Sequence, residues 1–203
     1  MNDREFWDER FGAQGYAYGT EPNVFLEESV SFIPSSGQVL CIAEGEGRNA
    51  VFLAKNGFDV SAVDISHAGK RKTETLASEN GVQVSYTISD LDDFDLGAGA
   101  WDAIVSIFGY IGPNAEARKF VYQRIQKGLK PGGIFIVEAY HPRQLEYGTG
   151  GPKDIDFLPA LEEFKKAFEA SGFLHGAERE REVFEGEFHT GASYVTQVVW
   201  KKA

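Results

Sequence analysis

A short apolar run that passes through a glycine-rich turn into a helix constrains the fold of this chain most. Residues 39–43 (Val-Leu-Cys-Ile-Ala) have the length and composition of a strand that is buried on both faces. The turn at residues 44–47 (Glu-Gly-Glu-Gly) follows, and residues 49–55 have the pattern of a helix that ends near Gly57. A strand, a tight turn and a helix in this order form the first half of a βαβ unit. The chain is therefore expected to contain a parallel sheet that is covered by helices.

The same alternation of strands and helices continues through the first two thirds of the chain. Glycine and proline residues separate the segments, as in the turn Pro131-Gly132-Gly133. Further strands are predicted at residues 60–64, 84–88, 102–107 and 134–139, and further helices at residues 68–80 and 115–129. This spacing predicts right-handed βαβ crossovers. The expected fold class is α/β, a Rossmann-like three-layer sandwich.

The last third of the chain has a different pattern. Residues 158–170 are predicted to form an amphipathic helix. Two strand-like stretches, 177–184 and 192–200, follow without a helix between them and should pair as an antiparallel hairpin at the edge of the sheet. Charges alternate in sign over residues 178–182, which we interpret as a solvated edge strand.

We expect one domain over residues 1–203. The aromatic-rich segment 1–36 should pack on this domain, residues 37–140 should form the alternating strands and helices, and residues 141–203 should supply a loop, a helix and the hairpin.

Charge and cysteine content exclude several classes of partner. The 203 residues carry a net charge of −11, which makes nucleic acids and anionic membranes poor partners. A single cysteine, Cys41, excludes disulfides and multi-cysteine metal sites, and no metal is expected. The N-terminus lacks the pattern of a secretory signal, and no apolar run is long enough to cross a bilayer. We therefore predict a cytoplasmic protein.

The glycine loop has the features of a nucleoside-binding site. Gly45 and Gly47 allow a ligand to approach the backbone between a strand and a helix. Asp64 ends the next predicted strand, 17 residues after Gly47, where a carboxylate can accept from both ribose hydroxyls. Residues 45–50 also match the G-x-G-x-x-A dinucleotide pattern. A plain turn with a solvated aspartate is the alternative.

Charge distinguishes between the possible cofactors. A dinucleotide would place a pyrophosphate beside Glu44 and Glu46, at a cost on the order of 1 kcal/mol or more for each carboxylate. S-adenosylmethionine has no phosphate, and it carries an ammonium and a sulfonium that acidic neighbours favour. The loop therefore favours S-adenosylmethionine.

Motifs along almost the whole chain resemble the class I S-adenosylmethionine-dependent methyltransferases, and within them the small tellurite-resistance-type enzymes. The resemblance rests on the glycine loop followed by Arg48-Asn49, on Ser89-Asp90-Leu91, on residues 108–111 (Phe-Gly-Tyr-Ile), on residues 129–133, and on the N-terminal residues 7–11 and 18–23. It implies a seven-stranded, mostly parallel sheet whose single antiparallel strand comes from the C-terminal hairpin. It also implies that segment 1–36 is an N-terminal lid or helical segment, that residues 37–140 form the cofactor-binding core, and that residues 141–203 include a substrate loop.

The resemblance also implies where the cofactor binds. The loop around Gly45 and Gly47 would bind the methionine part, Asp64 the ribose, and Asp90 with Leu91 the adenine. The full expected cofactor-binding set is Tyr18, Ala43, Glu44, Gly45, Glu46, Gly47, Asn49, Asp64, Ile65, Ser66, Asp90, Leu91, Ile107 and Phe108.

Two positions depart from the loop pattern of this family, acidic-x-Gly-x-Gly-x-Gly. Cys41 occupies the acidic position and Ala43 the first glycine. We expect Glu44 to take over the contact with the ammonium, and Ala43 to fit if its φ angle is negative.

Catalytic residues cannot be assigned from a motif, because methyl transfer from a sulfonium requires orientation and water exclusion more than covalent help. The candidates are His141, as a base or substrate ligand, and Tyr110, beside adenine or substrate; a solvated loop histidine is the alternative for His141. The expected partner is a small-molecule methyl acceptor, such as a thiol or a metalloid oxyanion, and the expected state is a monomer or weak homodimer. The competing hypotheses are an NAD(P)-dependent oxidoreductase and a non-catalytic nucleoside-binding module.

Overall fold

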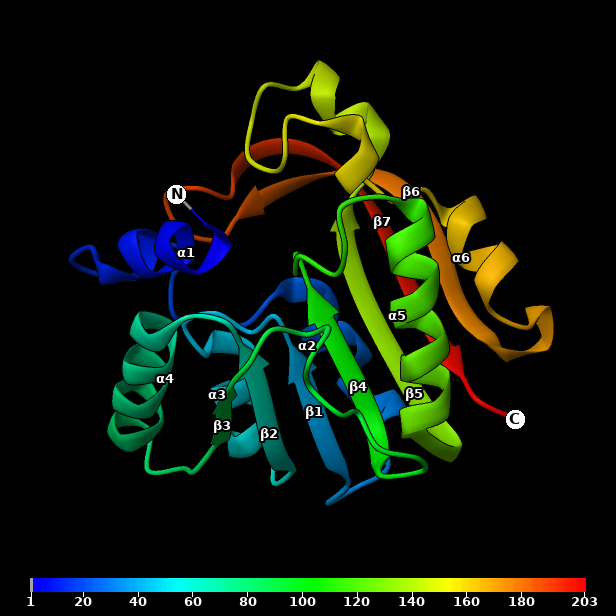
Figure 1. Ribbon diagram of the computed structural model, residues 1–203, viewed down its shortest axis with the longest axis horizontal. Helices are drawn as coiled ribbons and strands as arrows, with labels where there is room; N and C mark the ends of the chain where they lie inside the picture. Colours follow the sequence, from blue (N-terminus) through cyan, green and yellow to red (C-terminus); the bar gives the residue numbers. More distant parts are fainter. Residues whose placement is uncertain (1) are drawn as a thin grey trace.

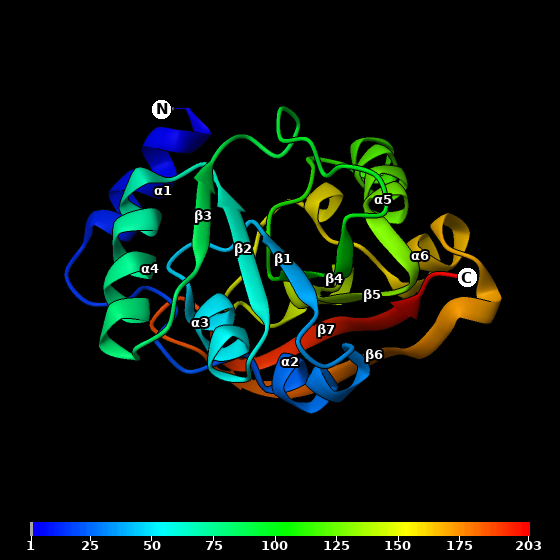
Figure 2. The ribbon, with the colours of Figure 1, turned by 90° about the horizontal axis from the view of Figure 1, so that it is seen from below.

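A seven-stranded sheet lies between two layers of helices in the computed structural model, which describes residues 2–203 (Figures 1 and 2). The order of strands is β3-β2-β1-β4-β5-β7-β6. β7 pairs antiparallel with both β5 and β6, so it alone runs against the other six strands. The predicted α/β fold is confirmed. The strands are β1 Gln38–Ile42, β2 Asp59–Asp64, β3 Ser85–Ile88, β4 Trp101–Ile107, β5 Leu129–Tyr140, β6 Phe173–Phe184 and β7 Thr190–Lys201.

Alternate residues of the central strands supply two separate cores. Leu40 and Ile42 of β1 face the layer that contains α5 and α6, whereas Val39 and Cys41 face the layer that contains α2 and α3. Both sets are buried, as expected for a strand covered on both faces. The helices are α1 Asp3–Gly12, α2 Val24–Ser29, α3 Arg48–Lys55, α4 His67–Glu79, α5 Ala115–Gly128 and α6 Leu161–Ala167.

The N-terminal segment packs on the domain. Helix α1 lies against α4 (Figure 1), and the Asp8 carboxylate accepts hydrogen bonds from Ser66 Oγ at 2.7 Å and from Ala68 N at 2.9 Å, at the first turn of α4. Lys72 of α4 donates to the carbonyl oxygens of Ala13 and Gly15. These contacts place α1 and the loop after it over the carboxyl ends of β1 and β2.

Two predicted boundaries were wrong. The helix predicted at 158–170 is limited to α6, because Leu158 precedes Pro159 and is extended, and Phe168 is extended as well. β5 begins at Leu129 rather than at residue 134, with a shift of register near its start.

The charged run 178–182 lies on β6, at the edge of the sheet, as predicted, and most of its side chains are exposed. Arg181 is the exception, since it points inward and pairs with buried acids.

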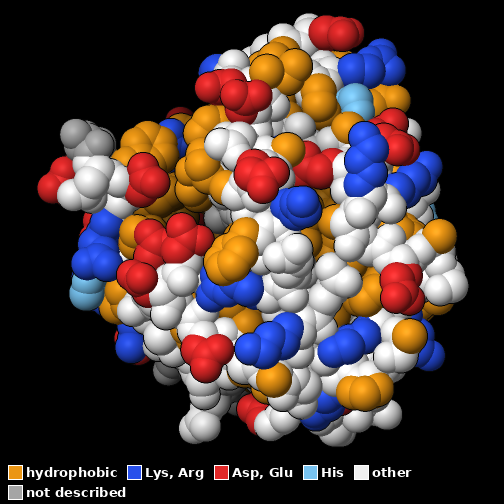
Figure 3. Space-filling model, turned by 45° about the vertical axis from the view of Figure 1, so that its right-hand side comes forward, with side chains coloured by type: hydrophobic (Ala, Val, Ile, Leu, Met, Phe, Trp, Pro, Cys, Tyr) orange, Lys and Arg blue, Asp and Glu red, His pale blue; other side chains and the backbone are white. Residues whose placement is uncertain are grey.

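Surface charges are mixed on the face drawn in Figure 3, where lysine and arginine side chains lie among aspartate and glutamate side chains. Within residues 2–203, no helix combines the length and the apolar character needed to cross a membrane.

Candidate functional site

The candidate site lies where the order of the strands reverses, at the carboxyl ends of β1 to β4. β1 pairs with β2 on one side and with β4 on the other, so the chain leaves β1 at a topological switch point. The glycine loop therefore lies between the ends of β2 and β4. Ser89 N donates to Asp64 O at 3.0 Å, which places the loop after β3 beside the end of β2.

Glycine is required at position 47 and favoured at position 45 of this loop. Gly47 has a φ angle of +91°, and a Cβ added there would lie 2.5 Å from the Thr73 side chain. At Gly45, with φ +66°, the nearest atom to an added Cβ is Cζ of Phe11 at 3.0 Å. The N-terminal segment therefore lies directly on the loop. Ala43 has a φ angle of +52°, so the condition of a negative φ angle for alanine here is not met, and this residue has a left-handed conformation that glycine adopts more easily.

The Glu44 carboxylate caps helix α3. Its Oε1 accepts from Asn49 N at 3.1 Å and from Ala50 N at 2.8 Å, two N–H groups of the first turn that Gly47 has no side chain to satisfy. Burial raises the pKa of the Glu44 carboxyl to about 7, although the hydrogen bond from Ala50 and the charge of Arg48 lower it.

The Glu44 carboxyl also lies near the Cys41 thiol. Burial raises the pKa of this thiol, and the nearby Glu44 carboxylate raises it further. The predicted contact of Glu44 with the ammonium of the cofactor stays a prediction.

The Glu46 carboxylate is paired, in contrast to the expectation that both loop acids would face the ligand. Its Oε1 accepts from Lys72 Nζ at 2.7 Å, and its Oε2 accepts from Tyr18 N at 3.4 Å. The residue is 4% exposed. Lys72 therefore balances the charge of Glu46, one of the two glutamates that flank the turn.

The Asp64 carboxylate is fixed between two loops. Its Oδ2 accepts from Gly45 N at 3.0 Å and its Oδ1 from Ser66 N at 2.9 Å. Burial raises the pKa of Asp64, against the effect of these backbone hydrogen bonds.

The other predicted cofactor-binding residues lie around the same edge of the sheet. Asp90 is exposed and accepts from Asp92 N, and Leu91 is half-buried against the core of α5. Asn49 is buried, and its Oδ1 accepts from Asn23 N at 3.0 Å, so it also holds the N-terminal segment. Ser66 caps α4, Ile65 and Ile107 are half-buried, and Phe108 follows β4 with a φ angle of +50°.

The two catalytic candidates have ordinary surroundings. His141 Nδ1 accepts from Arg143 N at 3.0 Å, which caps a short 3₁₀ helix, and its Nε2 lies 3.2 Å from a Glu178 oxygen. Burial lowers the pKa of His141, and Glu178 partly offsets this effect. Tyr110 is 39% exposed and packs beside Phe157.

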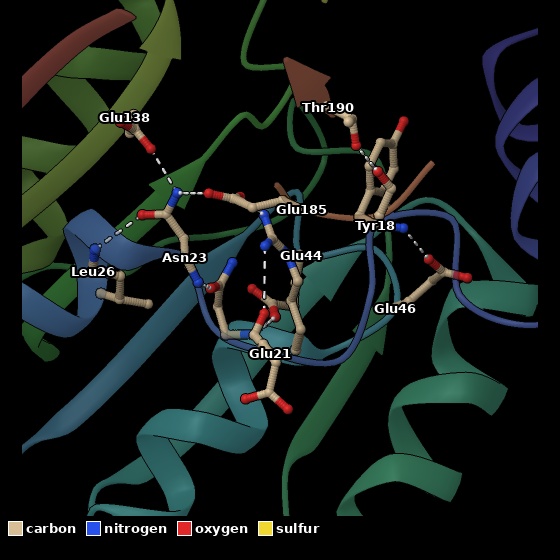
Figure 4. A network of polar contacts seen from close by, with 12 residues as sticks. Tyr18, Glu21, Asn23, Leu26, Glu44, Glu46, Glu138, Glu185 and Thr190 are labelled. Carbon is tan, nitrogen blue, oxygen red and sulfur yellow. Dashed lines mark hydrogen bonds and ion pairs between the residues drawn. The ribbon is translucent and has the colours of Figure 1, made fainter. Parts of the chain in front are cut away.

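Sequence reasoning missed a buried network of charges beside the glycine loop (Figure 4). Glu138 of β5 is fully buried and accepts four hydrogen bonds. Arg181 bridges Glu138 and Glu185, and Arg48 Nη2 donates to Glu185 Oε2 at 2.6 Å. The network consists of Asn23, Arg48, Glu138, Arg181, Glu185 and Gln197. Its one sequence signal was a glutamate within the apolar run of β5.

A second missed feature is a group of rings next to this network, here called the aromatic cluster: Tyr18, Phe108, Tyr140, Phe188 and His189. The Tyr18 and His189 rings are 4.3 Å apart, and the Phe108 and Tyr140 rings stack at 4.5 Å. The cluster brings together the N-terminal segment, the exits of β4 and β5 and the loop between β6 and β7.

Comparison with known proteins supports the sequence resemblance. Residues 39–133 match a family described as "Methyltransferase domain". Ubiquinone biosynthesis O-methyltransferases from Rickettsia akari and Rickettsia prowazekii are 25% and 28% identical to this chain over 115 and 116 residues. Each match covers 56% of this chain and 44% of the relative, so the matched segment is less than half of each relative.

Solved structures share the fold over a larger part of the chain. TehB from Haemophilus influenzae has a TM-score of 0.71 at 16% identity, over 98% of this chain and 67% of that one. A SAM-dependent methyltransferase from Methanosarcina mazei has a TM-score of 0.70 at 13% identity, over 90% and 98%. These structures show that the fold is shared. The methyltransferase class that the sequence resemblance implies agrees with the family matched by residues 39–133.

Proposed function

We propose that this protein transfers the methyl group of S-adenosylmethionine to a small-molecule acceptor. The observation that carries the proposal is the position of the Glu44 carboxyl on the N–H groups of Asn49 and Ala50. A dinucleotide binds its pyrophosphate at such a helix N-terminus, so an acid in that place disfavours NAD(P) and favours a cationic donor. The oxidoreductase hypothesis is weakened for the same reason.

The residues present fit the donor. The loop around Gly45 and Gly47 would hold the methionine part, with Glu44 near the ammonium. Asp64 would bind the ribose, because each of its oxygens accepts one backbone N–H and has a further lone pair available. Asp90 and Leu91 would border the adenine.

The chain's own residues mainly orient the reactants and exclude water. When bound, S-adenosylmethionine supplies a methyl group that is already activated by the sulfonium. Phe11 covers Gly45, and Tyr18 is held on the loop by its hydrogen bond to Glu46. The N-terminal segment would therefore form the cover of the donor site, as the lid prediction states.

The acceptor is proposed to be a small molecule with an oxygen nucleophile, which the names of the O-methyltransferase relatives support. A thiol or a metalloid oxyanion is the alternative from the sequence. A cytoplasmic location and a monomer or weak homodimer stay predictions.

Calorimetric titration with S-adenosylmethionine and NAD⁺ tests the donor. We expect heat of binding for S-adenosylmethionine and much weaker binding of NAD⁺. Tight NAD⁺ binding without S-adenosylmethionine binding would contradict the proposal. Transfer of labelled methyl to a metabolite extract then separates an enzyme from a binding module, since a module binds the donor without any transfer.

The variant Asp64→Ala tests the ribose contact. Loss of its hydrogen bonds should weaken donor binding by about 1–3 kcal/mol. The matched control is Asp59→Ala, an exposed aspartate at the other end of β2, which should leave donor binding unchanged. Equal affinities of the two variants would remove Asp64 from the site.

A further inference from the structure

The glycine loop is buried beneath the N-terminal segment. Residues 45–50 are all buried. Phe11 of α1 lies directly on Gly45, since a Cβ added to Gly45 would be 3.0 Å from Phe11 Cζ. Access of a ligand to the backbone of Gly45 is therefore blocked on the side that Phe11 covers.

Helix α1 itself buries little apolar surface. Of its ten residues, only Phe11 is buried. A polar contact with α4 is made by Asp8, whose carboxylate accepts from Ser66 Oγ and from Ala68 N. Elements with few buried apolar contacts open at a small fraction of the free energy of global unfolding. The helix can therefore separate from the domain while the sheet stays folded.

The other end of the N-terminal segment is fixed to the domain. Asn23 is fully buried, and its Nδ2 donates to Glu138 at 2.5 Å and to Glu185 at 2.9 Å. Between α1 and Asn23 the chain passes through Gly15 and Gly19, whose φ angles are +77° and +72°. Glycine changes its backbone conformation at the lowest cost. The two glycines are therefore the points at which the chain before Asn23 can turn.

One lysine holds the middle of the segment to both α4 and the glycine loop. Lys72 Nζ donates to Ala13 O at 2.9 Å, to Gly15 O, and to Glu46 Oε1 at 2.7 Å. All three of its hydrogens are therefore used. Oε2 of Glu46 accepts from Tyr18 N at 3.4 Å (Figure 4). The ion pair thus holds residues 13–18 at both of their ends.

This ion pair is largely shielded from water. The Lys72 side chain is 20% exposed and the Glu46 side chain is 3% exposed. Lys72 Nζ lies over the Tyr16 ring, 5.4 Å from its centre, and the Tyr16 hydroxyl donates to Lys72 O at 3.3 Å. Removing one partner of such a pair leaves the other charge buried and unpaired. Loss of Lys72 therefore destabilises the closed position of the segment, in which Glu46 is covered.

From these contacts we infer that Lys72 is a positioning residue that, with Glu46, forms a latch: it closes residues 13–18 over the glycine loop and sets how fast the donor enters and leaves. The word donor rests on the proposed function, whereas the latch rests on the contacts of Lys72 alone. When the pair separates, the segment turns at Gly15 and Gly19 and uncovers Gly45. When the pair forms again, the segment closes over the bound donor.

Amide hydrogen exchange of the donor-free protein, measured by mass spectrometry, tests the latch. Lys72→Met keeps an unbranched side chain and removes the charge and the three donors. Exchange within residues 5–19 should become about tenfold faster, while β1, β4 and β5 keep their protection. The matched control is Lys70→Met, which changes a lysine of the same helix that lies 3.8 Å from Glu74 on the surface and should leave the exchange unchanged.

A double-mutant cycle tests whether Lys72 acts through Glu46. Glu46→Gln should speed the same exchange, and the double variant should exchange no faster than Lys72→Met alone, because the two side chains form one interaction. Multiplied effects of the two substitutions would overturn the latch. Unchanged exchange in Lys72→Met, or equal exchange in Lys72→Met and Lys70→Met, would overturn it as well.

Stopped-flow binding of S-adenosylmethionine tests the effect on the donor. Tryptophan fluorescence supplies the signal, since Trp7 of α1 stacks on Phe11 at 5.2 Å. In Lys72→Met, association and dissociation should both become about tenfold faster, so that the dissociation constant changes by less than about threefold.

The two rates separate a latch from a damaged site. Faster dissociation without faster association, or unchanged rates, would overturn the inference, because a damaged site loses the donor without admitting it sooner. If exchange responds as expected while the unmodified protein does not bind S-adenosylmethionine, the latch stands and the proposed methyltransferase function fails.

Discussion

The glycine loop and the buried charge network hold their acids in opposite ways. Glu44 of the loop contacts backbone N–H groups, and burial raises the pKa of its carboxyl to about 7. Burial also acts to raise the pKa of Glu185 in the network, but Arg48 and Arg181 outweigh it and hold that pKa below its usual range. The carboxyl in the glycine loop therefore has a pKa near neutral pH, whereas the carboxylate of Glu185 in the charge network stays ionised at that pH.

This difference matches the contacts that each region makes. At the proposed donor site, the Glu44 carboxyl forms no ion pair within the described residues, so a cationic cofactor could favour its ionised form. In the charge network, the paired charges join the N-terminal segment to β5, β6 and the loop after β6. Glutamate thus supplies a carboxyl that can gain or lose a proton in the glycine loop, and a carboxylate that holds segments of the chain together in the charge network.

The substitution Glu138→Gln should have the largest effect on stability. It removes the negative charge that faces Arg181 and leaves two arginines with one carboxylate, Glu185. Breaking a buried ion pair in this way typically costs about 3–5 kcal/mol. Urea unfolding at pH 7 measures the loss.

The matched control is Glu182→Gln, which changes an exposed glutamate on β6. We expect a change within about 0.5 kcal/mol for this variant. A similar small change for Glu138→Gln would mean that the charge network does not hold the N-terminal segment, β5 and β6 together.

The substitution Glu44→Gln should have a smaller effect that depends on pH. The folded-state pKa of about 7 exceeds the ordinary value of 4.5, so the unfolded chain loses this proton first and stability falls as the pH rises from 4.5 to 7. Glutamine cannot ionise, so the variant lacks this fall. The free energy of unfolding of Glu44→Gln relative to the unmodified protein should therefore rise across this window, by at most about 3 kcal/mol.

Unfolding curves at several pH values, with the exposed Glu28→Gln variant of α2 as the control, measure this effect. Parallel pH profiles for Glu44→Gln and the unmodified protein would show that Glu44 does not titrate in that range. Donor binding adds a second readout, because Glu44→Gln should weaken binding of S-adenosylmethionine more than binding of neutral adenosine.

The glycine loop and its surroundings were predictable because their signals are local in sequence. The apolar run of β1, the glycines at 45 and 47 and the aspartate at the end of β2 lie within 26 residues of each other. Strand and helix periodicity therefore gave the sheet, the hairpin and the position of the glycine loop. The boundaries of α6 and β5 were wrong because Pro159 and a register shift in β5 overrode the apolar pattern.

The charge network and the aromatic cluster were not predictable because their residues meet only in three dimensions. Asn23 and Glu185 are 162 positions apart, yet they share a hydrogen bond. His189 is one of four histidines, and only the fold shows that it lies beside Tyr18 and Tyr140. Even at the glycine loop, the pairing of Glu46 with Lys72 depends on how α4 packs against the loop.

The substitution Ala43→Gly should have the smallest effect on stability. It tests whether backbone strain or packing of the Ala43 side chain dominates at this position of the glycine loop. A non-glycine residue at φ +52° costs roughly 1–2 kcal/mol, while glycine costs about 0.4–1 kcal/mol through the entropy of the unfolded chain, so a net gain of about 0.5–1 kcal/mol is expected. Ser36→Gly is the control, because Ser36 has a φ angle of +57° in an exposed turn before β1. Thermal unfolding should show a similar gain for both variants. A loss at Ala43 alone would mean that its Cβ packing beside Gly109 outweighs the strain, and that the alanine in the glycine loop is a structural part of the site.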